Sequence, residues 1–178
     1  MPVQIGAKAH SFAEPMGLLS DCHRRIEMFL GTLVRLAELV DRPLDDDART
    51  GLDSALKYFR EAAPKHTADE EESLFPRLRK LLNPEIDAAI RTLEPLEQDH
   101  RRANALHAEV DQLGRTWLAN DRLQEFDRKR FRADVMELSS IYKEHIRIED
   151  EVLFPAAGRT LPATEKAVIA GEMAARRK

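Results

Sequence analysis

One segment occurs twice in this chain: residues 66–76 read HTADEEESLFP, and residues 145–155 read HIRIEDEVLFP. Six of the eleven positions are identical, namely one histidine, two glutamates and the closing Leu-Phe-Pro. In each copy a glutamate follows the histidine by four residues, which places both side chains on one face of a helix. The repeat therefore predicts two similar helices that each present an imidazole and a carboxylate together.

A second, weaker repeat lies upstream of each copy. Residues 21–25 read DCHRR and residues 98–102 read QDHRR, so His23 precedes the first copy and His100 precedes the second. Each half of the chain consequently reads as a helix with one histidine, a loop, and a helix with the His-x-x-x-Glu pattern. We expect two such helical hairpins to pack face to face with approximate two-fold symmetry.

Hydrophobic residues recur every three or four positions through most of the chain, a pattern typical of amphipathic helices. Pro64 and Pro76 lie inside this pattern and are expected to kink or interrupt the second helix locally, and Pro95 is expected to kink the third. The predicted fold class is all-α: an antiparallel up-down-up-down four-helix bundle with a short extra C-terminal helix. Five helical segments are predicted, at about 15–41, 45–82, 84–118, 123–157 and from 163 onward.

Composition supports a helical fold and excludes several classes of function. Only 7 of the 178 residues are glycine, 9 are proline and 6% are aromatic, which disfavours a β-sandwich. Lys and Arg number 28 against 32 Asp and Glu, so the net charge is −4 and no basic excess favours nucleic-acid binding. The single cysteine can form neither an internal disulfide nor a Cys-x-x-Cys metal or redox pair.

Sequence patterns also bear on location and domain organisation. The first residues lack the apolar run of a secretory signal, and no run of roughly 18 apolar residues occurs that could span a membrane. We therefore expect a cytoplasmic protein without membrane association. We divide the chain into an N-terminal extension (1–14), a four-helix bundle (15–160) and a short C-terminal helix (161–178).

The repeated histidines and glutamates form a candidate metal site. A duplicated structural hairpin would explain the repeated Leu-Phe-Pro, but not the recurrence of histidine and glutamate on the apolar faces. A buried glutamate is costly unless it is paired or bound to a metal. Helical bundles build di-iron and di-manganese sites from inward-facing carboxylates and histidines on facing helices. We therefore predict that six ligands converge inside the bundle: His23, His66, Glu70, His100, His145 and Glu149.

Imidazole and carboxylate ligands favour iron, with manganese or zinc as substitutes, over metals that prefer thiolate. Two ions in such sites lie about 3.5–4 Å apart, a span that one carboxylate bridges. Two ferrous ions bring four positive charges and the two glutamates return two, which leaves room for a hydroxide, an oxide or another acidic ligand. Glu27 and Glu97 are candidates for that extra ligand, and each could equally lie on the surface or support a ligand from outside.

These motifs resemble those of the hemerythrin-like, HHE cation-binding domain proteins, and the resemblance covers about residues 16–157. The family implies a four-helix bundle with a non-haem centre of two iron ions, oxo- or hydroxo-bridged, that meets dioxygen or related small ligands. Carried over by position, the resemblance makes the four histidines terminal ligands and makes Glu70 and Glu149 the bridges.

Two departures separate this chain from the oxygen carriers of that family. The carriers have His-x-x-x-His on the third helix, whereas Asn104 occupies the second place here and would leave one iron with an open, water-filled or carboxylate-filled position. The carriers also use His-x-x-x-x-Asp on the last helix; Asp150 has that spacing, but Glu149 matches Glu70 in the repeat and is preferred. Both departures argue against reversible oxygen carriage and resemble the regulatory, iron-sensing and iron-centre-repair branches.

Several other residues near these motifs are interpreted as structural. His107 is expected to be a satisfied interior histidine rather than a distal ligand or proton relay. Tyr142 is expected to be a core tyrosine rather than a donor beside the site or a redox-active phenol. We expect an exposed position for His10, solvated faces for Glu71 and Glu72, and a packing or surface role for Cys22.

The preferred function is binding or sensing of dioxygen, nitric oxide or peroxide, because no general acid–base pair or nucleophile stands out beside the ligands. Two alternatives are a di-iron oxidase or peroxidase, in which the position beside Asn104 activates oxygen, and an iron-handling protein that repairs damaged iron centres. A helical interaction module with a vestigial site is the least specific hypothesis. The expected partner is a small diatomic ligand or peroxide; a protein partner is compatible with the sequence, and the oligomeric state does not follow from it.

Overall fold

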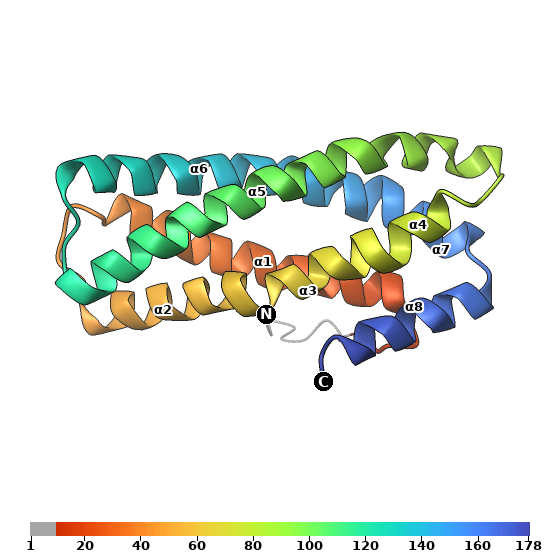
Figure 1. Cartoon of the computed structure of the whole chain (residues 1–178), viewed down its shortest axis with the longest axis horizontal. Coiled ribbons are helices and arrows are strands. Elements are labelled where there is room, and N and C mark those ends of the chain that lie inside the picture. Colours follow the sequence, from red (N-terminus) through yellow and green to blue (C-terminus); the bar gives the residue numbers. More distant parts are fainter. Residues whose placement is uncertain (1–9) are drawn as a thin grey trace, which may run out of the picture.

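The computed structural model describes residues 10–178, and all regular secondary structure in that part of the chain is helical. The predicted all-α class is therefore confirmed. The four longest helices of these residues are α1 (Pro15–Glu38), α2 (Asp46–Glu61), α5 (Asp87–Asn120) and α6 (Glu125–Ile148). Figure 1 shows them lying side by side along the long axis of the molecule.

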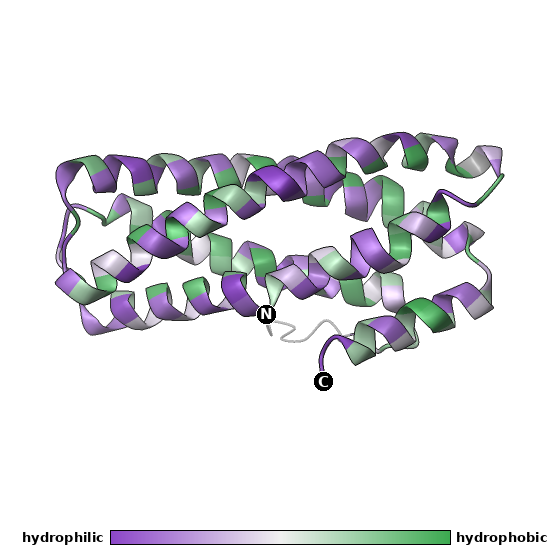
Figure 2. Cartoon of the chain, in the orientation of Figure 1, coloured by the Kyte–Doolittle hydropathy of each residue, from purple (hydrophilic) through white to green (hydrophobic). Residues whose placement is uncertain are grey.

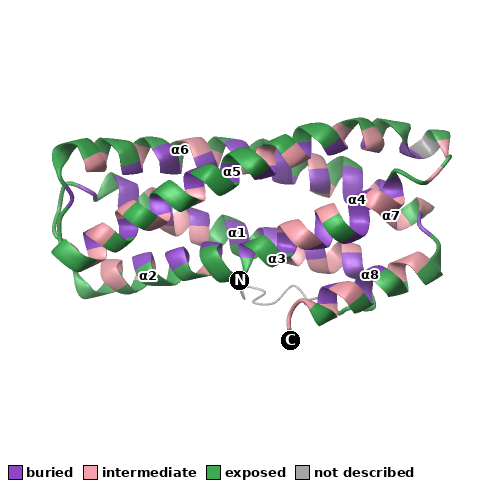
Figure 3. Ribbon diagram, viewed as in Figure 1, coloured by how far each residue is buried: buried purple, intermediate pink, exposed green. Residues whose placement is uncertain are grey.

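The four long helices enclose a common apolar core. α1 packs against α2 and α6, and α5 packs against the same two helices, so each long helix has two long neighbours. Hydrophobic residues alternate with hydrophilic ones along each helix in Figure 2, and buried residues alternate with exposed ones in Figure 3. Between α5 and α6, Trp117 meets Phe131 edge to face, with ring centroids 5.6 Å apart.

Two clusters of buried apolar residues divide this core along its length. On α1, Leu19 belongs to one cluster and Ile26 to the other; on α5 the corresponding residues are Leu96 and Ala103. The histidines that the sequence selects on α1 and α5 fall between these pairs. The candidate site therefore occupies a polar layer between two apolar regions.

The second predicted helical segment is interrupted beside Pro64, as its sequence suggests. α2 begins where the side chain of Asp45 accepts a hydrogen bond of 2.7 Å from the backbone N–H of Ala48. It ends at Glu61, and α3 (Ala63–Ala68) follows with Pro64 in its first turn. Proline is tolerated there because the N–H that it lacks would have no partner within the helix.

A wide, π-helical turn follows in each copy of the repeat. These turns and the helices after them are η1 (Asp69–Leu74) with α4 (Phe75–Leu78), and η3 (Glu149–Leu153) with α7 (Phe154–Thr160). The backbone N–H groups of Phe75 and Phe154 donate to carbonyls five residues back, those of Glu70 and Glu149. In a regular α-helix the proline after each phenylalanine would clash with the carbonyl four residues back. The wider turn removes that conflict and is the form taken by the kink predicted at Pro76.

The third predicted segment starts later than the sequence suggests, and unlike the second segment it forms one uninterrupted helix. A short 3₁₀ turn, η2 (Pro84–Ile86), precedes α5. α5 then continues through Pro95 without interruption and ends before Asp121, which takes a left-handed conformation with φ of 59°. Pro95 therefore lies inside a continuous helix.

The last helix, α8 (Ala163–Ala175), packs against η1, so the chain end returns to the first copy of the repeat. Arg176 and Arg177 follow it and donate hydrogen bonds of 3.0 and 2.5 Å to the fully buried Asp69. Figure 1 shows α8 lying beside the main group of helices. The predicted C-terminal helix and the two arginines that follow it thus hold the first π-turn in place.

Part of the predicted N-terminal extension (1–14), namely residues 1–9, lies outside the described residues. Among the helices of residues 10–178, none combines the length and the apolar character needed to cross a membrane.

Candidate metal centre

The structure brings the six predicted ligands together from four parts of the chain. Their ligand atoms form two groups, and in each group these atoms lie within 4.8 Å of one another, on buried side chains. We call His23 and His66 the first half-site and His100 and His145 the second half-site. Both half-sites share Glu70 and Glu149.

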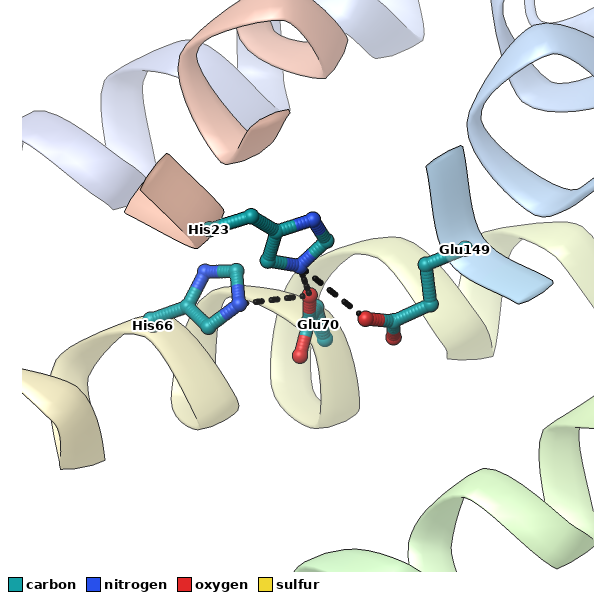
Figure 4. Close-up of side chains that lie close together, drawn as sticks. All are labelled: His23, His66, Glu70 and Glu149. Carbon is teal, nitrogen blue, oxygen red and sulfur yellow. Dashed lines mark ion pairs between the residues drawn. The ribbon is translucent and has the colours of Figure 1, made fainter. Parts of the chain in front are cut away.

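Figure 4 shows the first half-site with the two shared carboxylates. Nε2 of His66 lies 3.1 Å from Oε1 of Glu70, as the spacing of four residues on one helical stretch predicts. Nε2 of His23 approaches from α1 and lies 3.1 Å from Oε2 of Glu149 and 3.9 Å from Oε1 of Glu70. Both imidazoles therefore present the same ring nitrogen to the carboxylates.

The second half-site repeats this arrangement. Nε2 of His145 lies 3.1 Å from Oε2 of Glu149, and Nε2 of His100 lies 3.3 Å from Oε2 of Glu70. The two Nε2 atoms of this half-site are 3.0 Å apart. Glu70 thus turns one carboxylate oxygen toward each half-site.

Several atoms in the middle of the cluster are buried without a hydrogen-bond partner: Nε2 of His23 and both carboxylate oxygens of Glu70 and of Glu149. Buried polar groups normally find partners, because an unsatisfied one costs roughly 1–3 kcal/mol and a charged one more. Cations placed among these atoms would satisfy them together. Imidazole nitrogens and carboxylate oxygens are donors that iron, manganese and zinc accept, so the residues present fit a pair of metal ions.

Without metal, the pKa values of the two shared glutamates are shifted in opposite directions. Burial and the neighbouring Glu149 raise the pKa of Glu70, whereas burial of Glu149 is outweighed by the adjacent histidines, which lower its pKa. Burial opposes the charge on His23, but the nearby carboxylates of Asp150 and Glu149 raise its pKa to about 10. Burial and the nearby His23 lower the pKa of His66. Metal ions would therefore displace protons held by Glu70 and His23.

Two carboxylates outside the cluster fix the imidazoles that come from α1 and α5. Oδ1 of Asp150 lies 2.9 Å from Nδ1 of His23, and Oε1 of Glu71 lies 2.8 Å from Nδ1 of His100. Such a contact sets the tautomer and turns Nε2 toward the metal position. Each acid directly follows a shared glutamate in one copy of the repeat and supports a histidine in the other half of the chain.

The prediction that Glu71 lies on a solvated face is therefore wrong. Its carboxylate is turned toward His100, and the residue is only partly exposed. The signal was available, because Glu71 and Asp150 occupy matching positions in the repeat and both are acidic. Asp150, left open as an alternative ligand, lies outside both groups and supports His23 instead.

The other two histidines are supported less well on their outer side. Oδ2 of Asp99 lies 3.5 Å from Nδ1 of His145, close but beyond a direct hydrogen bond. Nδ1 of His66 is buried and has no partner. The four histidines are arranged similarly around the two glutamates, but the contacts of their outer ring nitrogens differ.

The repeated phenylalanines pack against the histidines. Phe154 stacks on His23 with ring centroids 5.3 Å apart, and Phe75 lies parallel to the ring of His100 at 6.3 Å. Both phenylalanines are buried, and each supports a histidine of the other half of the chain. The repeated Leu-Phe-Pro therefore orients imidazole rings as well as filling the core.

Three residues that the sequence left open lie outside the cluster. Glu27 pairs with Arg24 at the surface, and Glu97 pairs with Arg79. Asn104 is exposed and lines a separate cavity. Within the described residues, then, neither glutamate belongs to the cluster, and Asn104 does not line the void next to it.

His107 and Tyr142 form a pair beside the cluster. Nε2 of His107 lies 3.0 Å from the hydroxyl of Tyr142, and the His107 ring stacks on Phe59 with centroids 4.2 Å apart. Burial lowers the pKa of His107 to about 4 and raises the pKa of Tyr142, so both are neutral near pH 7. These contacts agree with the expectation of satisfied interior side chains.

The remaining expectations concern three residues outside the cluster: His10, Cys22 and Glu72. His10 is exposed, and its Nδ1 lies 3.1 Å from Oδ1 of Asp21. Cys22 is buried and its Sγ accepts a hydrogen bond of 3.3 Å from Arg25, which gives it a packing role. Glu72 is exposed, as expected.

A void of about 10 Å³ lies beside the cluster, lined by all four histidines and by Tyr142. This volume is close to the smallest that holds one water molecule. Ile26, Ala63 and Ile146 line it as well, so its walls are partly apolar. The space next to the half-sites therefore suits a ligand of a few atoms.

The fold and the cluster together define a helical protein with a buried histidine and glutamate site suited to a pair of cations. The chain belongs to the hemerythrin family: the model of the hemerythrin HHE cation-binding domain matches residues 15–157, a range that contains all six predicted ligands. The chain is also similar to a protein of Haemophilus influenzae that is named only as an uncharacterized protein. The two are 29% identical over 167 residues, which cover 93% of this chain and 91% of that protein.

Proposed function

We propose that this protein binds two iron ions in the cluster and uses them to bind or sense dioxygen, nitric oxide or peroxide. The observation that carries the proposal is that two groups of four ligands share Glu70 and Glu149. Sharing of both carboxylates suits a pair of ions, because ions in two-metal sites lie about 3.5–4 Å apart. Membership of a cation-binding family supports the metal, and the nitrogen and oxygen donors support iron.

In this proposal the two histidines of each half-site would hold one ion, and Glu70 and Glu149 would help to hold both. When bound, the iron pair supplies redox chemistry and coordination positions for a small ligand. The chain itself orients the ligands: Asp150 and Glu71 hold the outer nitrogens of His23 and His100 so that Nε2 faces inward.

The surroundings of the cluster favour a small ligand. The adjoining void of about 10 Å³ has room for a few atoms and none for an organic substrate. Two ferrous ions would bring four positive charges, and the two glutamates bring two negative ones. The remaining positive charge favours a ligand that carries or accepts negative charge. Both properties support dioxygen, nitric oxide or peroxide.

We further propose that residues 15–160 form an antiparallel up-down-up-down bundle, with α8 as a short extra helix. The pairwise packing of α1, α2, α5 and α6 supports this arrangement, and so do the short connections from α1 to α2 and from α5 to α6. Each half of the chain then contributes one hairpin and one half-site.

The proposal is tested by iron analysis and absorption spectroscopy after anaerobic purification. Wild type is expected to hold two irons per chain, whereas Glu149→Ala is expected to lose both and His66→Ala at least one. His10→Ala and Glu97→Gln change the same residue types outside the cluster and serve as controls. Retention of two irons and an unchanged spectrum in both cluster variants would show that the site is wrongly assigned.

Titration of the iron-loaded protein with nitric oxide separates binding from the alternatives. Stoichiometric, reversible spectral change without turnover supports a binding or sensing role. Sustained turnover of peroxide instead supports an oxidase or peroxidase, and rapid release of iron to a mild chelator supports iron handling.

A further inference from the structure

A second cavity, of about 430 Å³, lies between α1, α2, α3 and α5. Its apolar walls include Leu33, Leu56, Phe59 and Val110, all of them buried. Ala108 also lines it and is exposed, which places this residue at the mouth. The cavity shares no lining residue with the void at the metal cluster.

The charges at this cavity cancel one another. Arg60 and Asp111 both line it, and Nη1 of Arg60 lies 2.8 Å from Oδ1 of Asp111. Arg60 also faces Glu61 at 3.8 Å, and Asp111 faces Arg115 at 3.0 Å. An ionic ligand would have to compete with these pairs, so the cavity favours an uncharged one.

The volume favours an organic molecule over a diatomic one. A molecule of the size of water takes about 30 Å³ in the liquid, so a diatomic ligand would occupy a small part of 430 Å³. Pockets that bind organic ligands measure about 300–1,000 Å³ and have apolar walls with a few polar groups. The cavity matches that description and differs from the void at the metal cluster in both size and polarity.

One corner of the cavity offers hydrogen bonds. Nε2 of His107 is engaged by Tyr142, which leaves Nδ1 as the ring nitrogen for a ligand. The side chain of Asn104 lies one turn earlier on the same helix and lines the same cavity. Phe59, stacked on His107, extends the flat apolar wall next to this corner.

We propose that this cavity binds an uncharged molecule of the phenol class, with its ring against Leu56 and Phe59 and its hydroxyl at His107. The site goes beyond the metal centre and does not require metal. Tyr142 joins His107 on one side and lines the void at the metal cluster on the other. A bound phenol would therefore be separated from the cluster by one hydrogen-bonded pair of side chains.

Binding is tested by nuclear magnetic resonance titration of the full chain, metal-free and iron-loaded, with phenol, benzene and benzoate at pH 7. Phenol is expected to bind saturably and to shift the signals of His107 and Tyr142. Benzene is expected to bind about fivefold more weakly, because it lacks one hydrogen bond worth about 1 kcal/mol. Benzoate, which carries a charge without a partner here, is expected not to saturate.

Variants localise the binding. Ala108→Trp narrows the mouth and is expected to weaken phenol binding roughly tenfold or more, a change of about 1.4 kcal/mol or more. Ala88→Trp makes the same change at an exposed position elsewhere on α5 and is expected to have no effect. His107→Phe is expected to reduce the affinity for phenol to that for benzene and to leave benzene binding unchanged.

Three results would overturn the proposal: no saturation by phenol in wild type, equal affinity of phenol for Ala108→Trp and wild type, or binding of benzoate as tight as that of phenol. Iron content is measured on the same samples. Phenol binding by a protein that takes up no iron contradicts the proposed metal function alone. Iron binding without phenol binding contradicts the cavity alone.

Discussion

The two half-sites have the same inner ligands but different surroundings. In the second half-site, both imidazoles face an outer carboxylate. In the first half-site only His23 does. Nδ1 of His66 and Nδ1 of His145 are both buried without a hydrogen-bond partner, but only His145 has a carboxylate near this atom. A ligand whose outer nitrogen is unsupported is less well fixed in tautomer and orientation, so we expect the first half-site to hold its ion less tightly.

The cause of this difference lies in the residues next to the ligands. The residue before His100 is Asp99, which faces His145, whereas the residue before His23 is Cys22. The two copies of each repeat share the ligands but differ at neighbouring positions. Two further positions differ in the same way: Asp69 corresponds to Ile148, and His107 corresponds to Leu30. A duplicated motif can thus give two inequivalent metal positions.

The largest expected effect tests whether the two half-sites depend on the same glutamate. Glu70→Gln removes the charge and one oxygen from a carboxylate that faces both half-sites, so it is expected to abolish binding of both ions despite their different support. Iron analysis measures the outcome, with Glu97→Gln as the control. Loss of a single ion would mean that each glutamate serves one half-site.

The next effect concerns His107, which has a leucine as its counterpart in the first half of the chain. Burial lowers its pKa to about 4 in the folded protein, against about 6.5 when unfolded. The unfolded chain therefore binds more protons between these values, so stability is complete above pH 6.5 and falls as the pH drops toward 4. The expected loss is about 3 kcal/mol, at 1.36 kcal/mol for each pKa unit.

Urea unfolding of metal-free wild type and His107→Gln, followed from pH 7.5 to 4, measures this contribution. The glutamine can still hydrogen-bond to Tyr142 but does not titrate. Wild type is expected to lose more stability than the variant as the pH falls. Parallel pH profiles for the two proteins would show that His107 is not held neutral by the fold.

A smaller effect is expected at the first π-turn, which α8 fastens through Asp69. Asp69→Asn leaves Arg176 and Arg177 without their buried partner. Removal of one partner from a fully buried ion pair costs about 3–5 kcal/mol, and we expect about 2 kcal/mol because both arginines are partly exposed. Urea unfolding measures the loss. Asp87→Asn, an exposed change, is the control, and equal stability of the two variants would contradict this role for α8.

The smallest effect concerns the outer carboxylate that distinguishes the half-sites. A chelator is expected to remove iron from wild type in two kinetic phases, with the first half-site emptied first. Asp99→Asn is expected to lower the affinity of the second half-site by roughly tenfold at most, because such outer contacts are worth about 10–100-fold and this one is long. The rates of the two phases should then become more similar. Rates that differ as much as in wild type would contradict the role of Asp99 in distinguishing the half-sites.

Much of the fold and of the inner cluster could be predicted because it follows from local spacing. His66 and Glu70 lie four residues apart, and a helix places them on one face wherever it packs. The interruption beside Pro64 likewise follows from the chemistry of one residue. Pro95 shows the limit of such rules, since α5 continues through it.

The outer contacts could not be predicted in the same way. Glu71 supports His100 across 29 residues, and Asp150 supports His23 across 127. The sequence indicated acids at matching positions, but not which ring nitrogens they would face. The π-turns were missed too, because the kink expected at Pro76 does not specify which hydrogen bonds replace the lost one.

The sequence by itself determined the helical class and the two His-x-x-x-Glu faces, because both depend on periodicity within one helix. Only the tertiary structure decided that the two carboxylates are shared, that Nδ1 of His66 has no partner, and that the buried Asp69 meets Arg177 from 108 residues away. These features depend on how separate helices are rotated and brought together, and small rotations decide which side chain a ring nitrogen faces.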